Sequence, residues 1–124
     1  MNIQEVNQVA QALLRTVAGY EGAFEGAYNI RQDSGCAGRR STENIRIQPK
    51  PDGEPGLEIH VAPGTRDEKV YIPAVVTHGH VNDVAYNDFH IGAGAKVTIV
   101  AGCGMHTQDE GESRHDGIHR FYLA

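Results

Sequence analysis

The stretch Ile91–Val100, IGAGAKVTIV, carries the clearest prediction of the fold class. Gly92 and Gly94 allow a tight corner with positive φ, and β-branched residues recur at alternate positions after it. In such a strand Val97 and Ile99 point to one face, and the residues between them point to the other. A Gly-x-Gly-Ala corner that leads into a strand is typical of solenoids, so we expect coils that stack in one direction.

Segments on both sides of this corner also have the pattern of short strands. Apolar residues alternate with polar ones at positions 44–48, 57–61 and 69–72, and residues 118–123 are expected to form a further strand. Pro- or Gly-rich turns separate most of these segments. Several short strands divided by turns predict a mainly β body, and a β-sandwich fits the same pattern. Pro73 follows directly on one of the strands, which predicts an edge strand, a bulge or a break.

The amino-terminal part of the chain differs from the rest. Residues 2–18 predict a helix, because apolar side chains recur at spacings of three and four residues. Residues 20–40 are less regular, with a short strand expected at Ala27–Arg31 and an exposed turn at 33–40. We therefore divide the chain into an N-terminal helix with an irregular segment at residues 1–40, and a β core at residues 41–124.

Composition excludes several functional classes. The chain has 124 residues, a net charge of −5 and no run of Lys or Arg, so we expect no nucleic-acid partner. No apolar run is long enough to span a bilayer, so we expect no membrane partner. Without an evident signal peptide, the two cysteines are expected to be reduced thiols in the cytoplasm.

Most of the possible chemistry lies in one stretch, Ile99–Phe121. Thiolate, imidazole and carboxylate groups are what a zinc or iron site recruits. Cys103 and His106 are three residues apart across Gly104, which suits one metal in a turn, and His115 and His119 are four apart, which places both on one face of a helix or a strand. Asp116 is a candidate to orient a histidine or to ligate directly. The candidate metal ligands are therefore Cys103, His106, His115, Asp116 and His119.

Two other interpretations of this stretch remain open. The segment His115–His119, HDGIH, superficially resembles the zinc-protease pattern His-Glu-x-x-His, which needs a helix and a Glu as general base. Asp116 replaces that Glu and strand-like residues follow, so we disfavour the protease. The other interpretation is a Gly-rich loop whose polar residues bind the backbone. We assign no ligand role to His60 or His90, and we disfavour one for His78 and His80, although their spacing of two residues suits a surface metal clamp.

Several segments resemble the SufB/SufD family of iron–sulfur cluster assembly proteins, from about Asn44 to the end. The longest strings are Gly-Cys-Gly-Met-His at 102–106 and Ser-Arg-His-Asp-Gly-Ile-His at 113–119. The segments that carry the resemblance are Glu43–Ile47, Leu57–Thr65, Val70–Pro73, Asp83–Gly92, Ile99–His106 and Gly111–Phe121.

This resemblance implies a right-handed parallel β-helix with flanking helices, of which residues 41–124 would be the start. It implies a scaffold on which an iron–sulfur cluster forms, with a SufC-type ATPase and a cysteine desulfurase that supplies sulfur. It also implies a homodimer or a SufB–SufD-like pair.

The chain departs from this family in length. Family members continue with more β coils and with a C-terminal helical region that docks the ATPase. We therefore expect a short SufBD-like member, or a truncated N-terminal part of one, whose open last strand is covered by another chain. The cluster-related residues of the longer members lie largely in the missing part, so the candidates named above rest on their own chemistry.

The leading hypothesis is a binding scaffold rather than an enzyme. Cys103 would supply sulfur to iron or to an iron–sulfur cluster, and His106, His115 and His119 would supply nitrogen. One thiol cannot hold a whole cluster, so we expect a site shared with a second chain. The alternatives are a small zinc-dependent hydrolase that uses the same residues, and a metal-free structural fragment.

Overall fold

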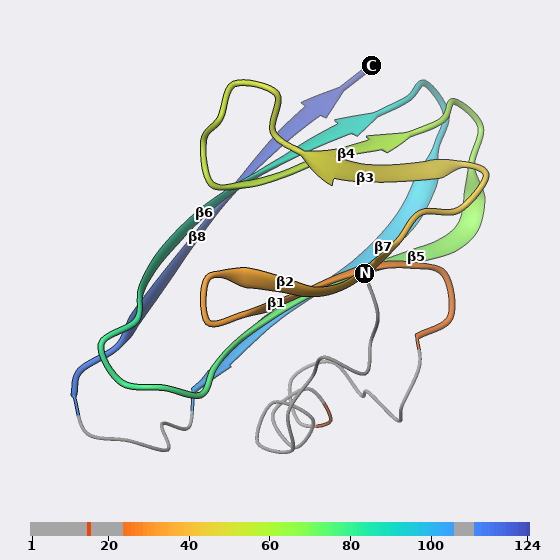
Figure 1. Cartoon of the computed structure of the whole chain (residues 1–124). Coiled ribbons are helices and arrows are strands. Elements are labelled where there is room, and N and C mark those ends of the chain that lie inside the picture. Colours follow the sequence, from red (N-terminus) through yellow and green to blue (C-terminus); the bar gives the residue numbers. More distant parts are fainter. Residues whose placement is uncertain (1–14, 16–23, 106–110) are drawn as a thin grey trace.

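The computed structural model describes Arg15, residues 24–105 and residues 111–124, and those residues build two four-stranded β-sheets (Figure 1). The strands are β1 (Ala27–Gln32), β2 (Gly35–Arg40), β3 (Ile45–Pro49), β4 (Gly56–Val61), β5 (Arg66–Val76), β6 (Asn82–Ile91), β7 (Lys96–Met105) and β8 (Arg114–Leu123). The prediction of a mainly β protein is therefore confirmed. The helix predicted at residues 2–18 lies almost wholly outside the described residues.

Strands that follow one another in the chain mostly lie in different sheets. Sheet A has the order β2-β1-β5-β7, and sheet B has the order β3-β4-β6-β8. The pairs β1–β2 and β3–β4 are antiparallel, whereas the later strands of each sheet pair in parallel. From β4 to β8, each successive strand therefore belongs to the other sheet, and from β6 onward each strand lies beside the strand two places earlier.

The corners that join the two sheets also stack on each other. Residues 92–95 form the turn between β6 and β7, with Gly94 at φ 69°, as the sequence predicts for this corner. This turn lies against the earlier corner at residues 62–65, because Gly92 donates to the carbonyl of Val61 at 2.9 Å and Gly64 donates to the carbonyl of Ala93 at 2.9 Å. Backbone groups of each corner are thus satisfied by the neighbouring corner.

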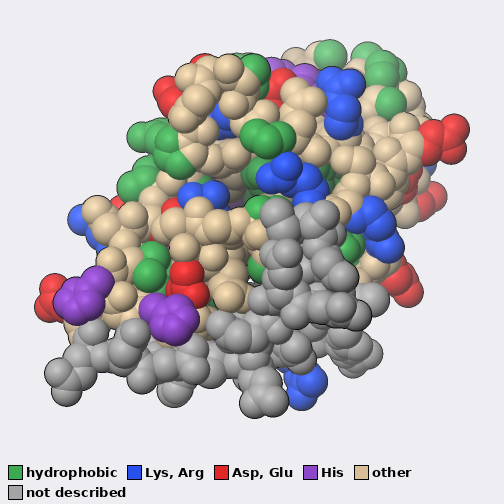
Figure 2. Space-filling view, viewed as in Figure 1, with side chains coloured by type: hydrophobic (Ala, Val, Ile, Leu, Met, Phe, Trp, Pro, Cys, Tyr) green, Lys and Arg blue, Asp and Glu red, His purple; other side chains and the backbone are tan. Residues whose placement is uncertain are grey.

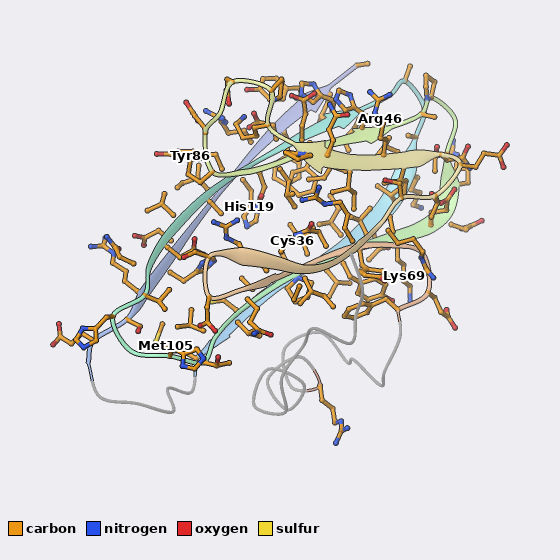
Figure 3. All side chains as sticks on the ribbon, viewed as in Figure 1. Cys36, Arg46, Lys69, Tyr86, Met105 and His119 are labelled. Atoms are coloured by element: carbon orange, nitrogen blue, oxygen red, sulfur yellow. The ribbon has the colours of Figure 1, made fainter. Side chains whose placement is uncertain are left out.

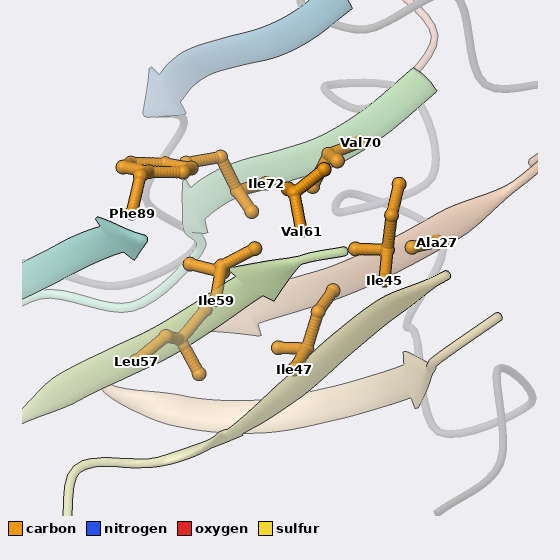
Figure 4. Packing of buried hydrophobic residues seen from close by; sticks show 9 residues of the cluster. All are labelled: Ala27, Ile45, Ile47, Leu57, Ile59, Val61, Val70, Ile72 and Phe89. Atoms are coloured by element: carbon orange, nitrogen blue, oxygen red, sulfur yellow. The ribbon is translucent and has the colours of Figure 1, made fainter. Parts of the chain in front are cut away.

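The hydrophobic core lies between the two sheets (Figure 4). Strands β3 and β4 bury side chains at alternate positions, which is the two-residue period of a sheet with one covered face. Phe89 from β6 is completely buried and stacks on Phe121 of β8 with ring centroids 4.9 Å apart. The core cluster consists of Ala27, Ile45, Ile47, Leu57, Ile59, Val61, Val70, Ile72 and Phe89.

Pro73 lies inside β5, a central strand of sheet A, and neither ends nor breaks it. The pairing of β5 with β1 joins Tyr28 to Tyr71 and Arg31 to Ala74, with no pair at Pro73 between them. On its other side, β5 pairs with β7 without interruption there. Because proline has no N–H to donate, it is tolerated at this gap in the ladder, and β5 is longer than the sequence predicts.

Residues 27–40 form the β1–β2 hairpin, so the exposed turn expected at 33–40 is confined to Asp33 and Ser34. Their φ angles are 48° and 69°, the left-handed values of a type I′ turn, which favours Gly at its second position. Asp33 also fixes the turn, because its carboxylate accepts hydrogen bonds from the backbone N–H and the hydroxyl of Thr77 at 2.7 and 2.6 Å.

We expect Ser34→Gly to raise the free energy of unfolding by about 0.5–1 kcal/mol, because Gly adopts the left-handed conformation without steric cost. Ser34 is exposed, so the substitution removes no packing. Urea denaturation measures the change as a higher midpoint at an unchanged slope. Asp33→Gly is the matched control and should destabilise, because it removes the two hydrogen bonds to Thr77. A lower midpoint for Ser34→Gly would contradict the role assigned to this turn.

Within the described part of the chain, the structure contains no helix with the length and apolar character that crossing a membrane requires.

Candidate functional site

A cavity of about 200 Å³ lies between the two sheets, beside the hydrophobic core. Its walls carry polar side chains from the inward faces of both sheets, and Figure 3 shows His119 between them. The cavity is lined by Asn29, Arg31, Leu57, Ile72, Pro73, Ala74, Asn87, Ala101, Gly102, Cys103, His115, Gly117 and His119. Three of the five residues predicted from the sequence therefore line one cavity.

The two histidines project from the same face of β8. They flank Gly117, and a Cβ on that glycine would lie 3.5 Å from Nε2 of His115 and 3.6 Å from Nε2 of His119. The absence of a side chain at Gly117 thus leaves open the space between the two imidazoles. Because this segment is a strand and the zinc-protease pattern requires a helix, the geometry excludes the protease interpretation.

His115 is oriented by Asp83, which the sequence analysis did not identify. Asp83 lies opposite His115 in the β6–β8 pairing, and its Oδ2 is 2.7 Å from Nδ1 of His115. The same carboxylate receives the guanidinium of Arg31, from sheet A, with Nη2 to Oδ1 at 2.6 Å and Nε to Oδ2 at 2.8 Å. A carboxylate on Nδ1 leaves Nε2 of this histidine available to a ligand.

The electrostatics of the cavity favour an ionised Asp83 and a neutral His119. Burial raises the pKa of Asp83, but hydrogen bonds from Arg31 and His115 outweigh it and hold the pKa below its ordinary value. Partial burial lowers the pKa of His119, and the nearby His115 lowers it further. A neutral imidazole has a lone pair to donate, so His119 is ready to bind a metal near neutral pH.

Cys103 approaches the cavity from sheet A, opposite the two histidines of sheet B. It lies on β7, is exposed and forms no disulfide. Cys36, the other free cysteine, does not line the cavity. Its sulfur is 3.5 Å from Oδ1 of Asn29, so Cys36 contacts a cavity residue without lining the cavity itself, and it provides the thiol control for experiments on Cys103.

Of the other two predicted ligands, Asp116 does not line the cavity. Asp116 forms an ion pair with Arg114 at 2.7 Å, and the role of orienting a histidine is taken by Asp83. His106 lies outside the residues that the structure describes. In the described part of the chain, one group of possible metal ligands has all its ligand atoms within 4.8 Å of one another, and it consists of Glu58, His60 and His90. The ligand atoms of Cys103, His115 and His119 are farther apart than this limit.

In the sequence, Val84 and Tyr86 are the alternate apolar residues of this segment, a pattern that predicts Asp83 on the solvent face. On β6 the inward positions are Asp83, Ala85, Asn87 and Phe89, all buried. A carboxylate and an amide at the apolar positions of a strand are unusual, because buried polar groups need partners. The local pattern of β6 therefore did not reveal Asp83, and its partners Arg31 and His115 come from distant segments of the chain.

Comparison of the chain with known proteins found no matching family model, no matching curated protein and no matching solved structure. The resemblance to the SufB/SufD family therefore rests on the sequence segments quoted above.

Proposed function

We propose that the protein is a component of an iron–sulfur cluster assembly scaffold of the SufB/SufD kind. The observation that carries this proposal is that Cys103, His115 and His119 line one cavity between the sheets. Thiolate and imidazole groups are the ligands that iron–sulfur clusters accept. Iron or a nascent cluster would be the cargo of this cavity, with Asp83 and Arg31 holding His115 in place.

The spacing of the donors favours a cargo of several atoms over a single ion. Bonds from zinc to sulfur or nitrogen are about 2.0–2.3 Å long, so the ligand atoms of one ion lie close together. The three donors here are more widely separated than that. A cluster reaches across a wider gap than one ion does, so this geometry favours the scaffold over the zinc-dependent hydrolase.

The proposal includes a fold and a set of partners. Strands β4 to β8 alternate between sheets and pair in parallel, which supports a right-handed parallel β-helix. One cysteine in the cavity calls for a second chain, either another copy or a SufB–SufD-like partner. A SufC-type ATPase and a cysteine desulfurase in the cytoplasm complete the proposed system.

An unpaired strand edge supports the second chain. In the described part of the chain, β7 and β8 are edge strands of their sheets. An edge strand offers free backbone groups to another strand. Among the residues that the structure describes, the large exposed apolar side chains are those of Met105, Ile118, Phe121, Tyr122 and Leu123, all on these two strands.

Anaerobic reconstitution with ferrous iron and sulfide tests the proposal. We expect the untagged protein to retain iron with acid-labile sulfide, and Cys103→Ser to lose nearly all of both, because hydroxyl oxygen is a poor substitute for thiolate. Cys36→Ser is the matched control, since it removes the other thiol, and it should retain the wild-type content. His115→Ala with His119→Ala should weaken retention while leaving thermal unfolding of the metal-free protein cooperative.

Four outcomes would contradict the proposal. Bound zinc with one exchangeable water and no sulfide would favour the hydrolase. No retained metal would favour a structural fragment. Equal losses of iron and sulfide in Cys36→Ser and Cys103→Ser would show that the cavity is not the binding site. A strict monomer by size-exclusion chromatography with light scattering, with and without iron, would contradict the shared site.

A further inference from the structure

A second group of metal-ligating side chains lies on the outer face of sheet B. Glu58 and His60 are on β4 and His90 is on the neighbouring β6. Their ligand atoms all lie within 4.8 Å of one another. Figure 2 shows histidine side chains at the surface at the top of the view, over sheet B. These residues face away from the cavity, because the alternate residues of β4 point into the core.

The register of the sheet brings this group together. His60 lies directly opposite His90 in the parallel β4–β6 pairing, and Glu58 precedes His60 by two residues on the same face. Nε2 of His60 is 2.5 Å from Oε1 of Glu58, which also receives the amide of Gln48 at 3.3 Å. The hydrogen bond from His60 is the main reason that the pKa of Glu58 lies below its ordinary value. The hydrogen bonds from His60 and Gln48 therefore hold the Glu58 carboxylate in position.

The two imidazoles take part in a stack that ends at Tyr122. The rings of His60 and His90 are 4.6 Å apart with planes at 8°, and the ring of Tyr122 lies 4.8 Å beyond that of His90. Lone pairs of two parallel rings lie in parallel planes and cannot meet at one point. Binding of one ion between them therefore requires the histidine rings to turn, which exchanges the stacking contact for two metal–nitrogen bonds.

We propose that Glu58, His60 and His90 form a binding site for a divalent first-row transition ion, separate from the cavity that holds Cys103. Two imidazoles and one carboxylate suit zinc, cobalt or iron better than magnesium or calcium, which prefer oxygen ligands. The side chains of Glu58 and His60 are 17% and 33% exposed, so solvent ions reach them.

Three protein ligands leave coordination positions open. A surface groove lies beside the site, and His60, His90 and Tyr122 belong to its lining together with Leu123 and Ala124. A water molecule or a small anionic ligand in this groove would complete the coordination sphere. The site therefore has the open form that exchangeable and catalytic metal sites share, rather than the closed form of a structural one.

Titration of the untagged, metal-free protein with cobalt(II) tests the site. The variant carrying Cys103→Ser, His115→Ala and His119→Ala isolates it from the cavity. We expect this variant to bind cobalt with visible d–d bands and without the thiolate-to-cobalt charge-transfer band, because the outer site contains no sulfur. Adding His60→Ala and His90→Ala should weaken that binding by more than about 100-fold, and Glu58→Gln by a smaller factor.

His78→Ala is the control for loss of a histidine elsewhere, and it should leave cobalt binding unchanged. Circular dichroism in EDTA checks that every variant keeps the β-sheet spectrum. Unchanged cobalt binding after loss of His60 and His90 would overturn the proposal, and so would complete loss of binding in the cavity variant alone. Neither result decides whether the cavity retains iron and sulfide, so the two proposals succeed or fail separately.

Discussion

Gly56→Ala is expected to lower the free energy of unfolding by about 4 kcal/mol or more, a value at the upper end for single substitutions. Gly56 begins β4 at φ 128°, a backbone conformation that L-residues rarely adopt. A Cβ there would lie 1.9 Å from the carbonyl oxygen of Tyr86. Tyr86 cannot retreat without loss of pairing, because it lies opposite Gly56 in the β4–β6 ladder and donates its N–H to the carbonyl of Pro55 at 2.8 Å.

Gly53→Ala is the matched control for this prediction. Gly53 lies in the same turn and also has a positive φ, 82°, but a Cβ there would meet nothing within 4 Å. It should cost only the backbone strain, about 1 kcal/mol. Urea denaturation measures both variants, and soluble yield with circular dichroism provides the readout if Gly56→Ala does not fold. Equal, small decreases in the free energy of unfolding for Gly53→Ala and Gly56→Ala would contradict this prediction, because they would show that β4 and β6 can move apart at Gly56.

Asp83→Asn is expected to lower the free energy of unfolding by about 2–3 kcal/mol at neutral pH. The side chain of Asp83 is 3% exposed and that of Arg31 17%, so loss of the negative charge leaves a mostly buried guanidinium without its partner. Full burial would place the loss at about 3–5 kcal/mol, and the remaining exposure of Arg31 reduces it. Because the ion pair joins sheet A to sheet B, the variant should also weaken metal retention in the cavity.

The pH dependence of stability checks the cause of this effect. The pKa of Asp83 in the folded protein lies below its ordinary value of 3.8, so the unfolded chain binds the proton more readily. The contribution of Asp83 is therefore present above pH 3.8 and is lost as the pH falls through the folded pKa. The free energy of unfolding of the wild type should therefore fall in acid as Asp83 becomes protonated. The Asp83→Asn variant should show a smaller fall over the same pH range, because it has no carboxylate at this position.

Asp116→Asn is the control for loss of a carboxylate on the same sheet. Asp116 pairs with Arg114, and their side chains are 43% and 73% exposed. An exposed ion pair contributes little to stability, so this variant should change the free energy of unfolding by less than about 0.5 kcal/mol. A loss as large as that of Asp83→Asn would show that the effect is one of net charge rather than of the buried contact.

The strands and corners were predictable because their causes are local. The alternation of Val97 and Ile99 and the positive φ of Gly94 follow from a single window of sequence and agree with the structure. Gly92 has no positive φ, and a Cβ there would lie 2.5 Å from the backbone nitrogen of Pro63 on the neighbouring corner. Pro73 was not placed correctly, because its tolerance depends on a gap in the ladder between β5 and β1. Such a gap involves a strand from a different part of the chain.

In the candidate site, too, the features with local causes were predictable and those that depend on strand order were not. The even spacing of His115 and His119 places them on one face of any strand, and the structure has both at one cavity. That Cys103 faces them from the other sheet depends on the order of the strands, which no local pattern reveals. His60 and His90 were assigned no ligand role for the same reason, since only the register of β4 with β6 makes them neighbours.

The interleaved order of β4 to β8 has a consequence for how the molecule acquires its structure. From β4 onward, two strands that pair in parallel are never consecutive in the chain, because the strand between them belongs to the other sheet. The two layers must therefore form together, and each partner strand must be recruited across an intervening loop and strand. Topologies dominated by such distant contacts fold slowly, so the chain spends longer with its strand edges exposed to other molecules.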